Sequence, residues 1–117
     1  MIIIIDYGMG NLGSVFKSLK RLNIDAKISS STKDIEYAKK LILPGVGHFA
    51  NGIRKLRELN LVELLNRKVI EDKTPILGIC LGMQLFASYS EEGCVDGLNW
   101  LNANVVKFNI KNKIKIP

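Results

Sequence analysis

The chain has 117 residues, enough for one domain, and 47% of them are hydrophobic, which excludes a disordered or fibrous protein. No apolar run approaches the ~20 residues that a transmembrane helix needs. The net charge of +6 does not indicate a nucleic-acid-binding protein, because four lysines after Asp96 supply most of the excess without interleaved aromatic residues. We therefore expect a globular domain that binds neither nucleic acid nor membranes.

The first apolar run and the two cysteines bear on the cellular compartment. Ile2 to Ile5 is apolar but lacks the basic leader and cleavage site of a signal peptide, so we interpret it as a strand covered on both faces. Cys80 and Cys94 give neither a disulfide framework nor the ligand spacing of a metal site. We expect a cytoplasmic protein without a metal or an organic cofactor.

Short apolar runs alternate with helical patterns along the chain, as in a parallel α/β sheet. The patterns predict strands over residues 2–5, 26–28, 41–43 and 76–79, and helices over 12–22, 34–39, 53–59, 61–69 and 81–89. A loop over 90–97 and two further strands, at 105–108 and 113–116, complete the prediction. The expected fold is a three-layer α/β sandwich with a mainly parallel sheet.

Three glycine-rich turns, at 8–10, 45–47 and 78–82, each follow the end of a predicted strand. In parallel sheets the ligand site lies outside the carboxyl ends of the strands. We therefore expect the three turns to meet at one edge of the sheet, and we place the functional site there.

The segment Gly78-Ile79-Cys80-Leu81-Gly82 has the spacing of a nucleophile elbow, with cysteine as the nucleophile. Such a tight strand-to-helix turn strains the backbone of the nucleophile, and the flanking glycines remove Cβ atoms that would clash. A helix N-terminus beyond a cysteine favours the thiolate, the form that attacks a carbonyl. Burial in the sheet core is the commoner fate of a free cysteine, so the spacing alone leaves both interpretations open.

The turn Pro44-Gly45-Val46-Gly47 follows the neighbouring strand. Its glycines let backbone N–H groups face an oxyanion, as acyl transfer from an amide requires. A plain turn is the alternative, but the shared sheet edge with Cys80 favours the oxyanion interpretation. We predict that the N–H groups of Val46, Gly47 and Leu81 form the oxyanion hole.

The run from Gly78 to Gln84 resembles, over its whole length, the nucleophile motif of the class I glutamine amidotransferases. The resemblance implies a flavodoxin-like α/β fold and hydrolysis of glutamine to glutamate and ammonia through a γ-glutamyl thioester on Cys80. It also implies that Gln84, with Gly45 and Gly47, binds the substrate glutamine.

Within that family, the run from Asp6 to Leu12 resembles the glutaminase subunits of imidazole glycerol phosphate synthase. The same order and spacing hold for three further segments, at residues 44–47, 97–100 and 115–117. The resemblance implies a heterodimer in which ammonia passes to a (β/α)8-barrel synthase subunit, which makes imidazole glycerol phosphate and AICAR in histidine biosynthesis. It also implies that Asn11 lies at the interface with the barrel.

The catalytic histidine and glutamate of the family lie in its last third, beyond the end of this sequence. We therefore interpret residues 1–117 as the N-terminal part of a single glutamine amidotransferase domain, with the C-terminal part of the sheet missing. His48 is the only histidine. Its turn supplies the oxyanion side of the elbow and not the thiol side, so we expect a solvated loop residue rather than the base.

Three alternatives to this assignment stay open. The first is a paralogous amidotransferase that supplies ammonia for the amination of bacterial surface sugars, whose front part has almost the same sequence pattern. The second is a redox sensor or chaperone of the DJ-1 type with a cysteine on the same elbow, against which Gln84 and the Pro44–Gly47 turn argue. The third is a structural or regulatory module.

Overall fold

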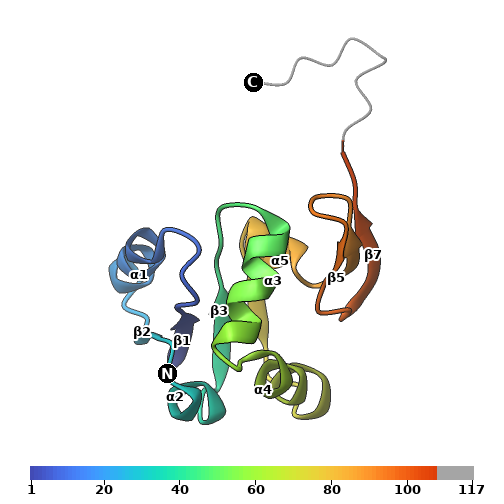
Figure 1. The fold of residues 1–117 in the computed structure, drawn as a ribbon. Coiled ribbons are helices and arrows are strands. Elements are labelled where there is room, and N and C mark those ends of the chain that lie inside the picture. Colours follow the sequence, from blue (N-terminus) through green and yellow to red (C-terminus); the bar gives the residue numbers. More distant parts are fainter. Residues whose placement is uncertain (108–117) are drawn as a thin grey trace.

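A four-stranded parallel sheet forms the centre of the computed structural model, which describes residues 1–107 (Figure 1). Its strands lie in the order β2-β1-β3-β4, and all three pairings are parallel. The predicted parallel sheet is confirmed, with strands β1 (Ile2–Ile5), β2 (Ala26–Ser29), β3 (Lys40–Leu43) and β4 (Ile76–Gly78).

Helices lie on both faces of this sheet, which gives the predicted three layers. The crossover from β1 to β2 runs opposite in direction to those from β2 to β3 and from β3 to β4. Because such crossovers are right-handed, α1 lies on one face and the other helices of these connections lie on the opposite face. The helices are α1 (Leu12–Arg21), α2 (Thr32–Glu36), α3 (Phe49–Glu58), α4 (Val62–Asn66) and the π-helical η1 (Arg67–Glu71).

The two faces of the sheet are covered unequally. Ile3 and Ile5 point into the main core, to which the helices contribute Ile35, Phe49, Ile53, Leu56, Leu65 and Leu81. On the α1 face, no residue of α1 is fully buried, and Leu77 of the edge strand β4 is 56% exposed. Because side chains alternate along a strand, Leu77 shares that face with its register partner Ile42. The α1 face is therefore only partly covered within residues 1–107.

The helix predicted over residues 34–39 lies earlier and is shorter. Ser31 is its N-cap, with a side-chain oxygen that accepts the Asp34 N–H at 3.4 Å. Past its end, the buried Lys68 ammonium donates to the carbonyl oxygens of Glu36 and Ala38, at 2.8 and 3.0 Å. The Lys68 ammonium thus donates to backbone carbonyl oxygens that, in a longer helix, would accept N–H groups from the next turn. The helix therefore ends here, and the chain continues into β3.

The helix predicted over residues 81–89 is wrong beyond its first turn. The helix α5 spans only Leu81–Gln84, and Ala87–Ser90 is strand β5. The carbonyl oxygens of Leu85, Phe86 and Ala87 accept N–H groups from residues 98–101. These tertiary bonds replace the helical bonds that the local pattern would have formed.

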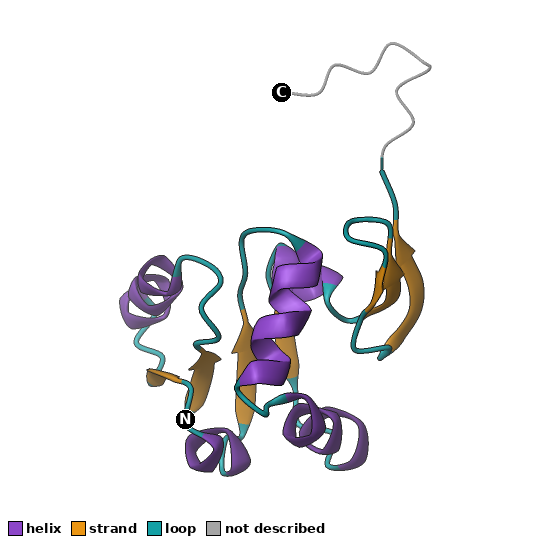
Figure 2. Cartoon of the chain, viewed as in Figure 1, coloured by secondary structure: helices purple, strands orange, loops and turns teal. Residues whose placement is uncertain are grey.

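Beside the central sheet lies a second, three-stranded sheet with the order β6-β5-β7 (Figure 2). The predicted loop over 90–97 contains β6 (Val95–Asp96), which pairs antiparallel with β5. The strand predicted at 105–108 is instead β7 (Leu101–Val105), parallel to β5. Phe108 and the strand predicted at 113–116 lie outside the described residues. Within residues 1–107, no helix has the length and apolarity to cross a membrane.

Candidate active site

The three glycine-rich turns meet at the carboxyl ends of β1, β3 and β4, as predicted. A Cβ atom added to Gly10 would lie 3.0 Å from the Cα of Gly45, and one added to Gly45 would lie 3.1 Å from the amide nitrogen of Gly82. Such close approaches of backbone to backbone are possible only without side chains. The turns therefore form one continuous backbone surface at this edge of the sheet.

Cys80 occupies the strained turn between β4 and α5. Its backbone angles are φ +52° and ψ −119°, in a region that residues with a side chain rarely adopt. A Cβ atom on Gly78 would lie 2.6 Å from the Cα of Met83, and one on Gly82 would lie 2.6 Å from the carbonyl carbon of Leu43. The thiol is exposed. The elbow geometry is thus confirmed, and burial of Cys80 in the core is wrong.

Replacing Gly82 with alanine is expected to destabilise the protein, because the added methyl group would overlap the backbone at Leu43. We expect the free energy of unfolding to fall by about 1–3 kcal/mol or more, as for other overpacked sites. Gly13→Ala is the matched control, because Gly13 lies in α1 with nothing within 4 Å of its added Cβ. Chemical denaturation compares the two. A Gly82→Ala protein as stable as the control would show that the elbow tolerates a side chain there.

The oxyanion donors predicted in the Pro44–Gly47 turn do not converge in this conformation. The N–H of Leu81 donates to the carbonyl oxygen of Gly45 at 3.1 Å. The Gly45–Val46 peptide is trans, so the N–H of Val46 points opposite to that carbonyl and away from Leu81. The two N–H groups can face one oxyanion only after this peptide turns over.

The ends of the same turn are held by side chains that the sequence analysis did not single out as functional. The hydroxyl of the buried Tyr7 donates to the carbonyl oxygen of Pro44 at 2.5 Å, and burial raises the pKa of that hydroxyl. At the other end, the N–H of Phe49 donates to the Glu92 carboxylate at 2.7 Å. The second contact joins residues 43 positions apart, so no local sequence pattern could have predicted it.

His48 is the N-cap of α3 rather than an uncommitted loop residue. Its Nδ1 accepts the N–H of Ala50 at 3.2 Å, and its side chain is exposed. A Cβ atom on Gly93 would lie 2.9 Å from the Cε1 of His48. The imidazole therefore lies between the start of α3 and the turn that joins β5 to β6, and its Nδ1 is engaged in capping α3.

Gln84 lies in α5 just after the elbow, and Asn11 lies just before α1. Gln84 is half-buried in α5, and its N–H donates to the carbonyl oxygen of Cys80 at 3.2 Å. Asn11 is exposed and is the N-cap of α1, with its Oδ1 accepting the Ser14 N–H at 3.4 Å. Both positions are compatible with the predicted roles, and Asn11 also has a structural one.

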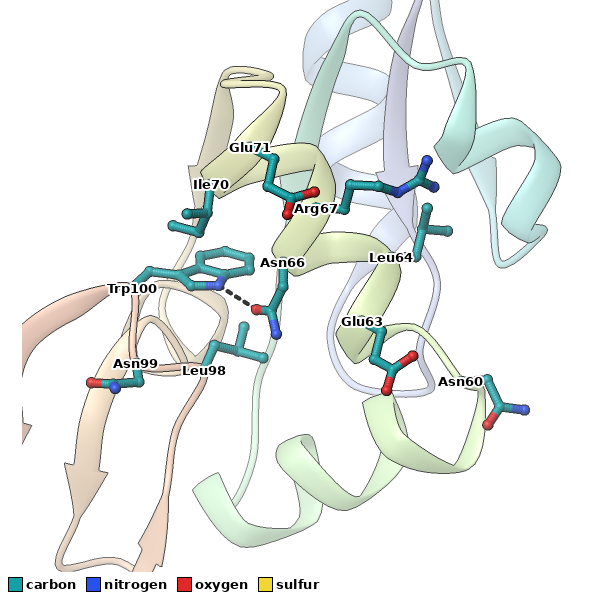
Figure 3. Close-up of a pocket in the computed structure, with 10 residues that line it drawn as sticks. All are labelled: Asn60, Glu63, Leu64, Asn66, Arg67, Ile70, Glu71, Leu98, Asn99 and Trp100. Carbon is teal, nitrogen blue, oxygen red and sulfur yellow. Dashed lines mark hydrogen bonds between the residues drawn. The ribbon is translucent and has the colours of Figure 1, made fainter.

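A cavity of about 800 Å³ lies elsewhere, between α4, η1 and the segment before β7 (Figure 3). Trp100 forms one wall, with its indole N–H donating to the Asn66 Oδ1 at 2.7 Å. Neither Cys80 nor any residue of the Pro44–Gly47 turn lines it. The cavity is therefore separate from the candidate site. Among the described residues, no group of three His, Cys, Asp or Glu side chains is placed to hold a metal ion.

Sequence comparison relates this chain to known proteins. The family described as "Glutamine amidotransferase class-I" matches residues 3–115. All 117 residues align with the imidazole glycerol phosphate synthase subunit HisH 2 of Methanococcus maripaludis at 53% identity, and with HisH 2 of Pseudomonas aeruginosa at 46%. In both alignments the chain spans 58% of the relative's length.

Solved structures share the fold at lower identity. A crystal structure of a glutamine amidotransferase matches 97% of this chain and 60% of its own, with a TM-score of 0.77 and 24% identity. A putative peptidase E protein from Listeria monocytogenes EGD-e matches 86% of this chain and 62% of its own, with a TM-score of 0.68 and 12% identity. These two likenesses establish the fold alone. The family match over residues 3–115 shows that the chain belongs to the class I glutamine amidotransferase family.

Proposed function

We propose that residues 1–117 are the nucleophile-bearing part of the glutaminase subunit of an imidazole glycerol phosphate synthase. The observation that carries the proposal is the exposed Cys80 on a strained elbow, beside the glycine-rich turn after β3. Similarity to HisH subunits over all 117 residues supports the choice of branch within the family. The proposed partner is a (β/α)8-barrel synthase subunit in a heterodimer, and the proposed substrate is glutamine.

The proposed reaction proceeds in two steps on Cys80. The thiolate attacks the side-chain amide carbon of glutamine, and the resulting oxyanion is stabilised by backbone N–H groups of Val46, Gly47 and Leu81. Ammonia leaves with the proton that a general acid supplies, and a γ-glutamyl thioester remains. Water then attacks the thioester carbonyl, which releases glutamate and restores the thiol. Gln84, one helical turn from the nucleophile, holds the substrate.

The Gly45–Val46 peptide gives this reaction a physical switch. In the conformation described above, the Leu81 N–H is occupied by the Gly45 carbonyl, so the oxyanion hole is incomplete. Docking of the synthase partner over the strand ends would favour the turned-over peptide and raise the hydrolysis rate. Such a population shift restricts glutamine consumption to the complex.

One experiment tests the function and separates it from its alternatives. The full-length protein and its barrel partner are assayed for glutamine hydrolysis and for formation of imidazole glycerol phosphate. Glutamine-dependent formation of that product supports the proposal. Glutamine hydrolysis without product formation points to the surface-sugar paralogue. Absence of hydrolysis, with Cys80 oxidised preferentially over Cys94, points to a protein of the DJ-1 type.

Replacing Asn11 with tryptophan is expected to weaken coupling between the proposed subunits. Asn11 is exposed where α1 begins, and a bulky side chain there would obstruct a partner at the strand ends. We expect partner-stimulated hydrolysis to fall while unstimulated hydrolysis stays low. The measurement is the ratio of the two rates. Because tryptophan also removes the N-cap, Asn11→Ser, which keeps a capping oxygen, is the control for helix stability. An isolated full-length subunit as fast as the complex would refute the coupling.

A further inference from the structure

The cavity beside α4 and η1 takes no part in the proposed glutaminase reaction. Its volume of about 800 Å³ lies within the ~300–1,000 Å³ of ordinary small-molecule sites. Its walls come from α4, from η1 and from the segment Leu98 to Trp100. The η1 turn is π-helical, a rare conformation that occurs frequently at functional sites. Size and backbone conformation together make this cavity a candidate for a second binding site.

One wall of the cavity is a tryptophan whose orientation is fixed. The indole N–H of Trp100 donates to the Asn66 Oδ1 at 2.7 Å, and the indole ring lies 4.9 Å from the ring of Phe86, centre to centre. Trp100 is half-buried and lines the cavity together with Leu98 and Ile70 (Figure 3). An aromatic ring held in this way can contact a cation or an apolar carbon chain with little further loss of side-chain freedom.

Two carboxylates lie toward the ends of the cavity. Glu63 in α4 and Glu71 in η1 both line it, and Figure 3 shows Trp100 and Asn66 between them. The eight positions between the two glutamates correspond to about 10–12 Å along the helix, at ~1.5 Å per residue or slightly less. Both residues are exposed, and within residues 1–107 neither forms a salt bridge.

The charge of the cavity favours a cation. Arg67 also lines it, but its guanidinium holds the Glu36 carboxylate through two hydrogen bonds, one of them 2.8 Å long. The unpaired Glu63 and Glu71 therefore leave a local excess of negative charge, although residues 1–117 carry +6 in total. The chain as a whole repels a polycation, whereas this cavity attracts one.

We propose that this cavity binds a linear aliphatic polyamine. The terminal ammonium groups pair with Glu63 and Glu71, and the carbon chain lies against Trp100. An ammonium group in the middle of the chain donates to the second lone pair of the Asn66 Oδ1, within cation–π reach of the indole. Extended spermidine has the length to meet both glutamates, and putrescine does not. The inference is independent of the proposed glutaminase function.

The test measures spermidine binding to the full-length protein by isothermal titration calorimetry, at about 0.15 M ionic strength, where exposed charges more than ~8 Å apart are largely screened. We expect putrescine to bind at least about fivefold more weakly, because it can pair with only one glutamate. Spermidine acetylated at both ends keeps the length and the middle charge but loses the terminal charges, so it should be weakened to a similar degree. Absence of spermidine binding, or equal binding of the three compounds, would overturn the proposal.

The variants Glu63→Gln and Glu71→Gln each remove one charge and keep the shape of the side chain. Each should weaken spermidine binding about three- to fivefold, as for one ion pair near the surface, and the double variant should weaken it on the order of tenfold. Asp72→Asn is the matched control, because Asp72 is exposed next to Glu71 but does not line the cavity. It should change the affinity less than about twofold. A loss in Asp72→Asn equal to that in the glutamate variants would show attraction to surface charge in general and would refute the site.

Trp100 supplies a signal from the site itself. Its indole N–H resonance, assigned in the NMR spectrum of the full-length protein by its absence in Trp100→Phe, should shift with the same dissociation constant as calorimetry gives. Trp100→Leu should weaken binding about threefold or more, whereas Trp100→Phe, which keeps an aromatic face, should retain most of the affinity. Binding that leaves this resonance unmoved would place spermidine elsewhere and contradict the proposal. None of these measurements requires glutamine hydrolysis, so they stand even if the glutaminase function fails.

Discussion

Replacing Cys80 with serine is expected to abolish glutamine-dependent activity of the full-length protein and its partner. The hydroxyl of serine is a far weaker nucleophile than a thiolate on the same elbow, and no other exposed thiol stands at the glycine-lined edge within residues 1–107. We expect kcat to fall on the order of 10³-fold or more, as for the loss of other covalent nucleophiles. Synthesis from added ammonia should persist, because under the proposed function the barrel partner would perform that chemistry. Steady-state rates with glutamine and with ammonium salts measure both.

Cys94→Ser is the matched control for this substitution. Cys94 is also exposed, but it lies between β5 and β6, where its sulfur is 3.7 Å from the carbonyl oxygen of Glu91. It should keep full glutamine-dependent activity, and a glutamine-mimicking electrophile should label Cys80 and spare Cys94. Full glutamine-dependent turnover in Cys80→Ser would refute the assignment of Cys80 as the nucleophile. Equal labelling of the two cysteines would mean that the elbow confers no activation.

The isolated polypeptide of residues 1–117 is expected to show no measurable glutaminase activity. Its only histidine, His48, follows the turn on the oxyanion side of the elbow and caps α3, so we expect Cys80 to lack a base in this polypeptide. General acid–base help is typically worth ~10²–10⁴-fold in rate, and expulsion of ammonia requires a proton donor. The exposed Leu77 on the edge strand β4 should also make this polypeptide associate. A glutaminase assay and size-exclusion chromatography of the purified polypeptide measure the two effects.

The substitution His48→Ala tests whether His48 is the catalytic base in the polypeptide of residues 1–117. We expect it to destabilise the start of α3, while glutaminase activity stays undetectable as in the parent. Robust glutamine hydrolysis by a soluble monomer, silenced by His48→Ala, would identify His48 as the base and refute the expectation. In the full-length protein, His48→Ala should lower the thermal stability and leave kcat nearly unchanged. The cap bond from the Ala50 N–H to His48, which the substitution removes, is local to the start of α3.

The central sheet and the elbow were predictable because their signals are local. The run from Ile2 to Ile5 is β-branched and continuous, and glycine or proline marks the exits of β3 and β4. The spacing Gly78-x-Cys80-x-Gly82 carries its own steric requirement, which the positive φ of Cys80 satisfies. The roles of Cys80, Gln84 and the oxyanion donors remain predictions.

The second sheet and the state of the oxyanion turn were not predictable, since both depend on contacts between distant segments. Residues 81–89 have a helical pattern, but bonds from residues 98–101 take the carbonyls of Leu85 to Ala87 and extend the chain. No sequence pattern shows that the Leu81 N–H is held by Gly45, or that Glu92 reaches Phe49. The active-site region is thus specified locally at the nucleophile and by tertiary structure around it.

The strand order β2-β1-β3-β4 lets the central sheet assemble in the order of synthesis. Each later strand pairs with one that has already left the ribosome: β2 and β3 with β1, and β4 with β3. No strand has to insert between two others or wait for a partner made later, so little sheet edge stays unpaired during translation. Cys80 comes just after Ile79, which follows β4, so its thiol leaves the ribosome after the strands β1 and β3 and the turns that follow them.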